Sequence, residues 1–342
     1  MADLTADAAA RMTARLAYLT ANRGRLTIDG DVHPSDPAAI PPAMAARMAT
    51  DPGYFHGRPL PDDRLVPLMD MAGVDMALCW QNPSVLTYGD DRAANGAANA
   101  HIAALAARHP TRVIPAGWTD PKALGVDGAI ALARRCVGEF GFPVVKMNPA
   151  QNAYPITDPM VLAVVDAIVE TGAAPAFHFG ADTPYTPAEG LVAIAARHPD
   201  HPVIGVHMGG GGAGFVEAEA TCQAARAAGL AHPNIVFVLS AKRDTHIESA
   251  LIAYAAAGGP FRRNIAVASD APYGNMVWNF GGFRALFAAL ADGATYGDPR
   301  LAANPGLFDA DTVQGFMGRN LADLVIAADR RILAKAGRAG AV

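Results

Sequence analysis

The sequence lacks the features of a disulfide-stabilised protein. Its 342 residues include only three cysteines, Cys79, Cys136 and Cys222, which lie far apart in the chain. An odd and sparse set argues against a disulfide framework and fits a reducing compartment. We therefore expect three buried thiols and a cytoplasmic location.

Features of membrane and nucleic-acid-binding proteins are also missing. No apolar stretch reaches the roughly 18 residues that a membrane helix requires. Lysine and arginine are scattered without a basic run, and the formal net charge is -5, so we expect neither nucleic acid nor a membrane as a partner. The first twenty residues carry early acids and lack the apolar core of a secretory signal. Their apolar spacing predicts an amphipathic helix, and residues 1–24 are assigned to an N-terminal helical segment.

The chain does contain many short apolar runs, each nearly continuous, as in strands buried on both faces. The runs span residues 26–33, 74–80, 112–118, 143–148, 174–179, 202–207, 234–240 and 264–270. Helical stretches separate nearly all of them. Eight strand–helix units in succession imply parallel strands with right-handed crossovers. The predicted fold is an α/β, (β/α)8 TIM barrel over residues 25–342. An open doubly wound sheet is the alternative, but a nucleotide fingerprint is missing.

Three Ala-rich helical stretches end in His-Pro, at His109, His198 and His232. Proline disfavours helix at the residue before it, and a histidine in the last turn can face exposed carbonyl groups. These three histidines are therefore predicted to end helices and not to bind metal.

Three segments are expected to form long loops over the C-terminal face of the barrel and to set specificity. They are residues 34–63, 180–187 and 271–308. The glycine run at 209–212, with Gly214, offers backbone N–H groups that can hold an anion, but it matches no P-loop spacing. We interpret it as a loop kept small so that the backbone can pass close to the site.

Polar residues occupy the C-terminal ends of the apolar runs, where active sites of such barrels gather. They are Asp29, Asp31, His33, Lys146, His178, His207 and Asp270. Residues two apart in a strand point to the same side, so Asp31 and His33 face one point. A carboxylate and an imidazole in this arrangement suit Zn, Mn or Fe, and His178 and Asp270 complete the ligand set. We predict one divalent metal ion, with zinc favoured and manganese as the second choice.

The segments IDGDVH, AFHFG, VIGVHMGG and ASDAPYG, in this order, resemble the amidohydrolase superfamily. The likeness is greatest to the amidohydrolase-related branch, which includes aminocarboxymuconate semialdehyde decarboxylase, resorcylate-type decarboxylases and pyrone lactone hydrolases. It runs from about Leu26 to GFMGRNLADL, where Asn320 resembles a recurring Gly-x-Asn. Asp31 stands where the family usually has His or Glu, and a shorter carboxylate reaches less far.

The resemblance also bears on Lys146. One subset of the superfamily has a carboxylated lysine at this place, bridging two metals. The related branch is mononuclear, which favours a lysine that binds a substrate carboxylate or phenolate. The alternative is an ordinary lysine paired with an acid such as Asp29.

Aromatic residues lie at the predicted mouth of the barrel and favour a pocket for a flat or apolar small molecule, although core packing is the default for any aromatic. The substrate-binding candidates are Trp80, Trp118, Tyr185, Tyr273 and Trp278. Phe280 and Phe283 are expected at a subunit contact, because related proteins form homodimers or higher homo-oligomers.

The favoured function is hydrolysis of a C–N or C–O bond in an amide, ester or lactone of a small aromatic or cyclic acid. The metal would lower the pKa of its bound water to about 7. Asp270 would be the general base, His207 would steady the oxyanion, and Lys146 would orient an acidic substituent. The alternative is non-oxidative decarboxylation of an aromatic or unsaturated acid, with Asp270 as the acid. A non-catalytic ligand-binding barrel is the third reading, and it predicts an eroded ligand set.

Overall fold

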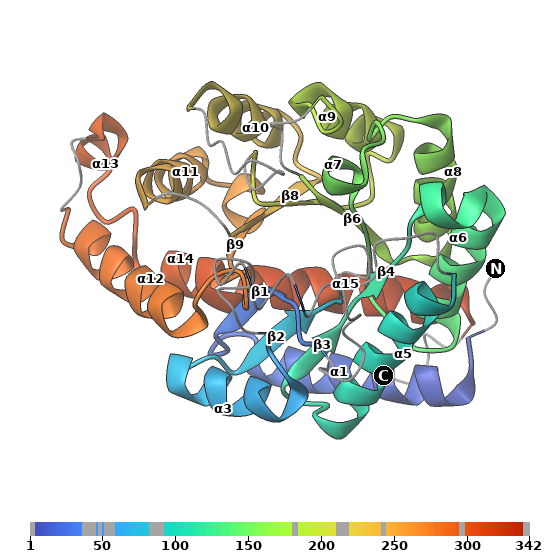
Figure 1. Cartoon of the computed structure of the whole chain (residues 1–342). Helices are drawn as coiled ribbons and strands as arrows, with labels where there is room; N and C mark the ends of the chain where they lie inside the picture. The colour runs from blue at the N-terminus through green and yellow to red at the C-terminus, as the bar shows by residue number, and fades with distance from the viewer. Residues whose placement is uncertain are drawn as a thin grey trace.

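The computed structural model describes residues 4–35, 46, 50, 59–81, 92–179, 184–209, 219–240, 244–293 and 298–337. Its strands lie at the centre and its helices surround them (Figure 1). In chain order, the strands are β1 (Ile28–Val32), β2 (Met76–Cys79), β3 (Val113–Pro115), β4 (Gly117–Trp118), β5 (Val144–Met147), β6 (Ala174–His178), β7 (Val203–Val206), β8 (Ile235–Leu239) and β9 (Ile265–Val267). All seven ladders between them are parallel, as the strand–helix alternation predicts.

The ladders form one sheet of β1 to β3 and another of β4 to β9. The sequence predicts a single strand over 112–118, but the run is divided at Ala116: its first half pairs with β2 and its second half with β5. The Ala116 N–H donates to the Cys79 carbonyl at 2.9 Å, so the pairing with β2 continues up to the point of division. At the other seam Val32 forms a parallel bridge with Ala271. The strands and their helices form the predicted (β/α)8 barrel.

The helices follow the strands along the chain. They are α1 (Ala6–Asn22), α3 (Asp62–Ala72), α5 (Arg92–Arg108), α6 (Pro121–Gly138), α7 (Pro149–Asn152), α8 (Pro159–Thr171), α9 (Ala188–Arg197), α10 (Glu219–Ala231), α11 (Asp244–Ala257), α12 (Met276–Ala291), α13 (Pro299–Ala303), α14 (Ala310–Gln314) and α15 (Asn320–Lys335), with a 3-10 turn η3 (Phe261–Arg263) and a π-helical turn η4 (Gly315–Arg319).

Local sequence explains the ends of these helices. In α8, the Asp158 side chain accepts from the Met160 N–H, proline occupies the first turn, and Gly172 ends the helix with a φ of 98°. The helices α5, α9 and α10 end one residue before His109, His198 and His232, which confirms the predicted helix-end histidines.

The N-terminal helix is fastened to the last helix of the barrel. α1 and α15 lie side by side across the molecule (Figure 1). Between them the buried Arg15 guanidinium donates to both carboxylate oxygens of Asp329, at 2.6 and 2.9 Å, and to the Gly141 carbonyl at 2.8 Å. A buried ion pair with this many hydrogen bonds fixes one helix on the other.

Several expectations about the outer parts of the chain need correction or fall outside the described residues. The predicted loop at 271–308 contains α12 and α13. Phe280 and Phe283 are 0% and 4% exposed, so they pack inside the chain and not at a subunit contact. Residues 36–45, 47–49, 51–58, 180–183 and 210–214 lie outside the described residues. They include most of the predicted loop at 34–63, half of the one at 180–187 and the glycine run after Gly209.

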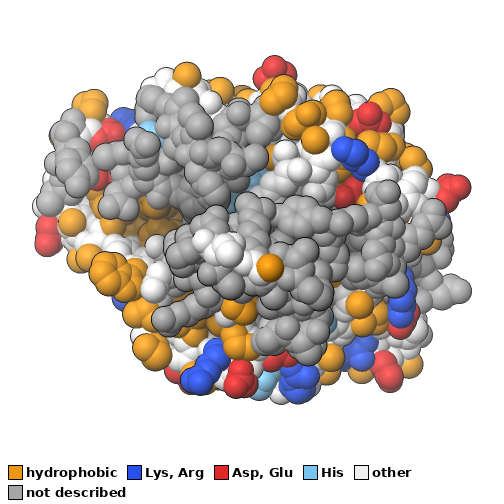
Figure 2. All heavy atoms as spheres, in the orientation of Figure 1, with side chains coloured by type: hydrophobic (Ala, Val, Ile, Leu, Met, Phe, Trp, Pro, Cys, Tyr) orange, Lys and Arg blue, Asp and Glu red, His pale blue; other side chains and the backbone are white. Residues whose placement is uncertain are grey.

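Surface and core agree with the composition. The three cysteines are buried and free, as predicted. Among the described residues, no helix has the length and apolar character needed to span a bilayer. On the face drawn in Figure 2, acidic and basic side chains are scattered around the rim, and histidine atoms are visible near its middle.

Candidate metal and substrate site

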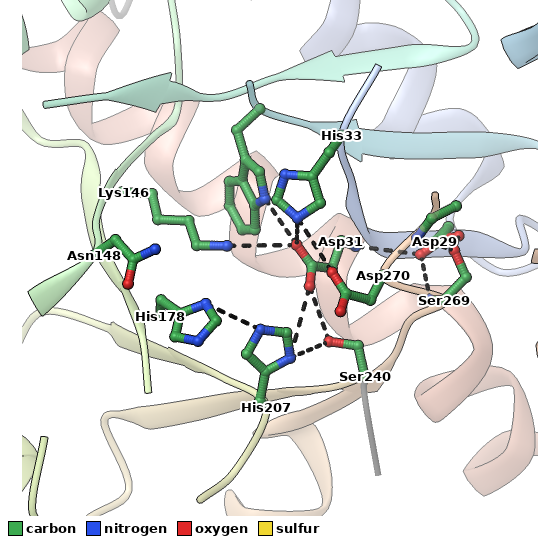
Figure 3. Close-up of polar contacts among 12 residues, drawn as sticks. Asp29, Asp31, His33, Lys146, Asn148, His178, His207, Ser240, Ser269 and Asp270 are labelled. Carbon is green, nitrogen blue, oxygen red and sulfur yellow. Dashed lines mark hydrogen bonds and ion pairs between the residues drawn. The ribbon is translucent and has the colours of Figure 1, made fainter. Parts of the chain in front are cut away.

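Seven buried polar side chains from six strand ends converge inside one end of the barrel (Figure 3). They are Asp31 of β1, His33 just after β1, Lys146 of β5, His178 of β6, His207 after β7, Ser240 after β8 and Asp270 after β9. The convergence that the strand-end pattern predicts is therefore present, and the structure adds Ser240 to it.

Asp31 lies at the centre of this cluster. Its Oδ1 accepts from Trp80 Nε1 at 2.7 Å, and its Oδ2 accepts from Ser240 Oγ at 2.9 Å. Lys146 Nζ is 3.5 Å from Oδ1 and His33 Nε2 is 3.2 Å from the same oxygen. Donors on both oxygens hold the plane of the carboxylate in place.

A bulge interrupts β1 at the position of Asp31. Between Asp29 and Val32 the register against β2 shifts, so three steps along β1 match two along β2. Gly30 makes this path possible, because a Cβ there would lie 2.8 Å from Val238 Cγ1. Despite the bulge, Asp31 and His33 point to one place, as their spacing predicts.

His33 lies between two carboxylates. Its Nε2 is 3.2 Å from Asp31 Oδ1 and 3.3 Å from Asp270 Oδ1. Ligand atoms around a tetrahedral cation with bonds of roughly 2.1 Å lie about 3.4 Å apart. These side chains therefore fit a divalent cation in both donor type and spacing.

A second grouping of potential ligand atoms overlaps with this one. Among the described residues, Asp31, His207 and Asp270 each place one ligand atom within 4.8 Å of the others. This grouping includes His207, for which the sequence predicts a catalytic role. His178 lies beside it, with its Nδ1 3.2 Å from His207 Nε2.

Two residues of the cluster have backbone conformations that L-residues rarely adopt. The φ angle is 81° at His207 and 58° at Asp270. Such conformations cost about 1 to 3 kcal/mol each and persist where the surrounding structure enforces them. Close packing enforces the turn after Asp270, since a Cβ on Gly274 would lie 1.9 Å from the Ser269 carbonyl oxygen.

Hydrogen bonds of Asp29 connect the end of β1, which carries Asp31, with the segment after β9, which carries Asp270. Its oxygens accept from the Asp31 N–H at 3.2 Å, from the Ser269 N–H at 2.9 Å and from the Ser269 hydroxyl. The Ser269 Oγ in turn accepts from the Ala271 N–H at 3.1 Å. Asp29 thus holds Asp31 and Asp270 in register, and it is not the partner of Lys146, as the alternative interpretation had it.

Lys146 is a buried cation between aromatic rings. Its Nζ is 4.1 Å from the centroid of the Trp80 ring and 6.0 Å from that of Trp118. The ring faces attract the ammonium group, and Asp31 balances its charge. Trp80 and Trp118, both substrate-binding candidates from the sequence, thus lie beside Lys146.

The tyrosines and the third tryptophan are placed differently from one another. Tyr273 makes an edge contact with His33, with ring centroids 5.5 Å apart. Tyr185 is partly exposed beyond β6, where its carbonyl accepts from the Ile156 N–H. Trp278 lies in the first turn of α12 with 79% of its surface exposed, so it is not part of the buried cluster.

Burial and charge shift the pKa values of the acids in opposite directions. Burial disfavours ionisation of Asp31, but Lys146 and His33 outweigh it and hold its pKa well below the usual range. Burial and the neighbouring Asp31 raise the pKa of Asp270 to about 6. Burial raises the pKa of Asp29 to about 7 and lowers the pKa of Lys146. Two carboxylates with separated pKa values are typical of sites that move protons.

Similarity to known proteins shows the family of the chain. The family model described as "Amidohydrolase" matches residues 28–275, which is most of the sequence. The chain belongs to the amidohydrolase family. No curated protein is similar enough in sequence to match it.

Several solved structures share its fold. A 5-carboxyvanillate decarboxylase from Novosphingobium aromaticivorans, complexed with manganese and a nitrobenzoic acid, has a TM-score of 0.61 and 15% identity, covering 89% of this chain and 97% of that one. A 2,6-dihydroxybenzoate decarboxylase from Rhizobium has a TM-score of 0.57 and 17% identity, covering 88% and 98%. An uncharacterized TIM-barrel protein from Bordetella bronchiseptica has a TM-score of 0.58 and 16% identity, covering 91% and 99%. At these identities the likeness shows the fold.

Proposed function

We propose that this amidohydrolase is a metal-dependent decarboxylase of a hydroxylated aromatic acid. The observation that carries the proposal is the buried Lys146 ammonium group, 4.1 Å above the Trp80 ring and 3.5 Å from Asp31. A fixed cation beside flat aromatic faces suits an anion attached to a ring. The similarity to decarboxylases of aromatic acids supports this choice over the hydrolysis favoured from sequence alone.

The charge of the site supports an anionic substrate. Asp31 and Asp270 contribute two negative charges when ionised, and Lys146 contributes one positive charge. A divalent cation changes the balance from one negative to one positive charge. A carboxylate monoanion neutralises this excess among buried side chains, whereas a neutral amide or lactone does not.

We propose Asp31, His33, His178 and Asp270 as the residues that hold the cation, manganese or zinc. When bound, the cation would supply positive charge that attracts the anionic groups of the substrate. Lys146 offsets the charge of Asp31 and lies close enough to orient the acid. The rings of Trp80 and Trp118 exclude water from the reacting end of the substrate.

Asp270 is proposed as the proton donor. Its proton forms the new C–H bond at the ring carbon that carries the carboxylate. The C–C bond then breaks, its electron pair restores the aromatic ring, and CO2 leaves. Solvent returns a proton to Asp270 after product release.

The test is a substrate panel with the purified protein, loaded with Mn²⁺ or with Zn²⁺. We expect CO2 release from hydroxybenzoates that carry an ortho hydroxyl. In D2O, the product should carry one deuterium at the carbon that lost the carboxylate. Hydrolysis of amides, esters or lactones in the same panel, without CO2 release from any acid, would reject decarboxylation.

A further inference from the structure

Trp118 carries a buried indole N–H that has no acceptor. The residue ends β4 and is 1% exposed. Among the residues that the structure describes, no atom accepts from its Nε1, although this nitrogen is buried. A buried donor without an acceptor opposes folding, and native proteins leave few of them. The Trp118 N–H can therefore serve a bound molecule instead of the fold.

The other tryptophan beside Lys146 uses its N–H differently. Trp80 Nε1 donates to Asp31 Oδ1 at 2.7 Å. The two indole rings flank the same ammonium group, with centroids 4.1 Å and 6.0 Å from Lys146 Nζ. Of these two N–H groups, the one on Trp80 is taken by the protein and the one on Trp118 remains for a ligand.

Strand pairing directs the Trp118 side chain into the barrel. In the parallel ladder between β4 and β5, Trp118 is the register partner of Lys146. Register partners on neighbouring strands have their side chains on the same face of the sheet. Lys146 points into the cluster, where its Nζ is 3.5 Å from Asp31 Oδ1 (Figure 3). Trp118 therefore shares the inner face with Lys146, and the two present an N–H and an ammonium group side by side.

The backbone of Trp118 is fixed before any ligand binds. The buried Asn99 side chain, on α5, donates to the Trp118 carbonyl and accepts from the Trp118 N–H, both at 2.8 Å. The next N–H, of Thr119, donates to the Lys146 carbonyl at 3.0 Å. A donor that is already held in position loses little freedom when it binds a ligand.

We propose that Trp118 is a specificity-determining donor for the substrate carboxylate. One carboxylate oxygen accepts from Trp118 Nε1, and the other faces the Lys146 ammonium group. A carboxylate has two accepting oxygens and suits two separate donors, whereas a phenolate has one. Hydrogen bonds to a charged acceptor are also the stronger ones. The inference rests on the proposed function in taking an aromatic acid as the ligand, and it adds the residue that distinguishes the acid from a neutral analogue.

The first test is the indole signal of Trp118. The chain has three tryptophans, so spectra of 15N-labelled protein contain three indole N–H signals, which triple-resonance spectra assign. Benzoate is the probe, because it has the carboxylate but lacks the ortho hydroxyl of the expected substrates. When benzoate is added to the Zn²⁺-loaded protein, we expect the Trp118 proton signal to move downfield as it gains a charged acceptor. The signal of Trp278, which is 79% exposed, should stay in place.

The second test is affinity. Trp118→Phe keeps an aromatic ring and removes the N–H, so titration calorimetry should show benzoate binding about 10- to 100-fold weaker than in the wild type. Trp278→Phe is the matched control, because it makes the same change at an exposed position, and should keep wild-type affinity. Benzamide, which has nearly the same shape and no charge, should bind the wild type more weakly than benzoate.

Three results would overturn the inference: no binding of benzoate, binding with an unmoved Trp118 signal, or wild-type benzoate affinity in Trp118→Phe. The spectra of the wild type decide the matter even where Trp118→Phe does not fold. Neither readout involves turnover. A protein that binds benzoate through Trp118 but releases no CO2 from any hydroxybenzoate would refute the proposed reaction and leave this role of Trp118 intact. Release of CO2 with an unmoved Trp118 signal would refute the role of Trp118 alone.

Discussion

At the scale of single residues, the site is defined by side chains whose backbone is costly to form. His207 and Asp270 both have positive φ angles. Aspartate and histidine tolerate this region better than most residues, yet the conformation still opposes folding. Packing at Gly274 and the hydrogen bonds of Asp29 enforce it at Asp270. The positive φ of Asp270 therefore lowers the stability of the fold, but it directs the Asp270 carboxylate toward the cluster.

Asp270→Asn tests that carboxylate. Asparagine also tolerates a positive φ, so the backbone is retained while the proton donor is lost. We expect kcat for the reaction in the substrate panel to fall by at least about 100-fold. Asp158→Asn makes the same chemical change at the N-cap of α8, where asparagine caps equally well, and should keep wild-type activity. A wild-type rate in Asp270→Asn would remove Asp270 from the proposed mechanism.

At the scale of elements, the attachment of the N-terminal helix α1 depends on a buried charge pair. Arg15 of α1 and Asp329 of α15 are 6% and 0% exposed, and burial raises the pKa of Asp329. The guanidinium compensates a carboxylate that water does not reach. The attachment of α1 therefore relies on this pair as well as on the apolar residues between the helices.

Arg15→Met should leave Asp329 buried without its partner. We expect the free energy of unfolding in urea to fall by about 3 to 5 kcal/mol. The double variant Arg15→Met with Asp329→Leu removes both charges and should recover most of that loss. A double variant no more stable than Arg15→Met would show that the loss does not come from the unpartnered charge of Asp329.

At the scale of the whole molecule, stability should depend on pH through His201. This residue is 7% exposed, and its Nε2 is 2.8 Å from the Ala173 carbonyl oxygen, so it donates there. Burial lowers its pKa from 6.5 to about 4. Below pH 6.5 His201 is protonated in the unfolded chain but stays neutral in the folded protein. The contribution of His201 to stability is therefore fully present above pH 6.5 and is lost as the pH falls toward 4.

The expected slope from His201 is at most about 1.4 kcal/mol per pH unit between these values. His201→Gln keeps a donor for the Ala173 carbonyl but does not titrate. Urea unfolding of both proteins from pH 4 to 7 should therefore show a smaller loss of stability in the variant at low pH. Identical pH profiles would assign the loss to other groups.

Local sequence predicted the elements and the residues at their ends well. The apolar runs became strands, and His109, His198 and His232 follow helices, because burial and proline act on neighbouring residues. The third run differs: it divides at Ala116, where the chain passes from one strand neighbour to the next. No local pattern reveals which neighbour a strand pairs with.

The sequence by itself determined which chemical groups stand at the strand ends, since two-residue alternation and strand length are local properties. Only the tertiary structure decided how they pair: Lys146 with Asp31, Asp29 with Ser269, and Ser240 between Asp31 and His207. It also placed Trp278 outside the cluster. The strand-end argument that selected the other polar residues applies equally to Ser240, but its role depends on Asp31, 209 residues away. Such partners are set by the closure of the barrel, which joins residues that share no local pattern.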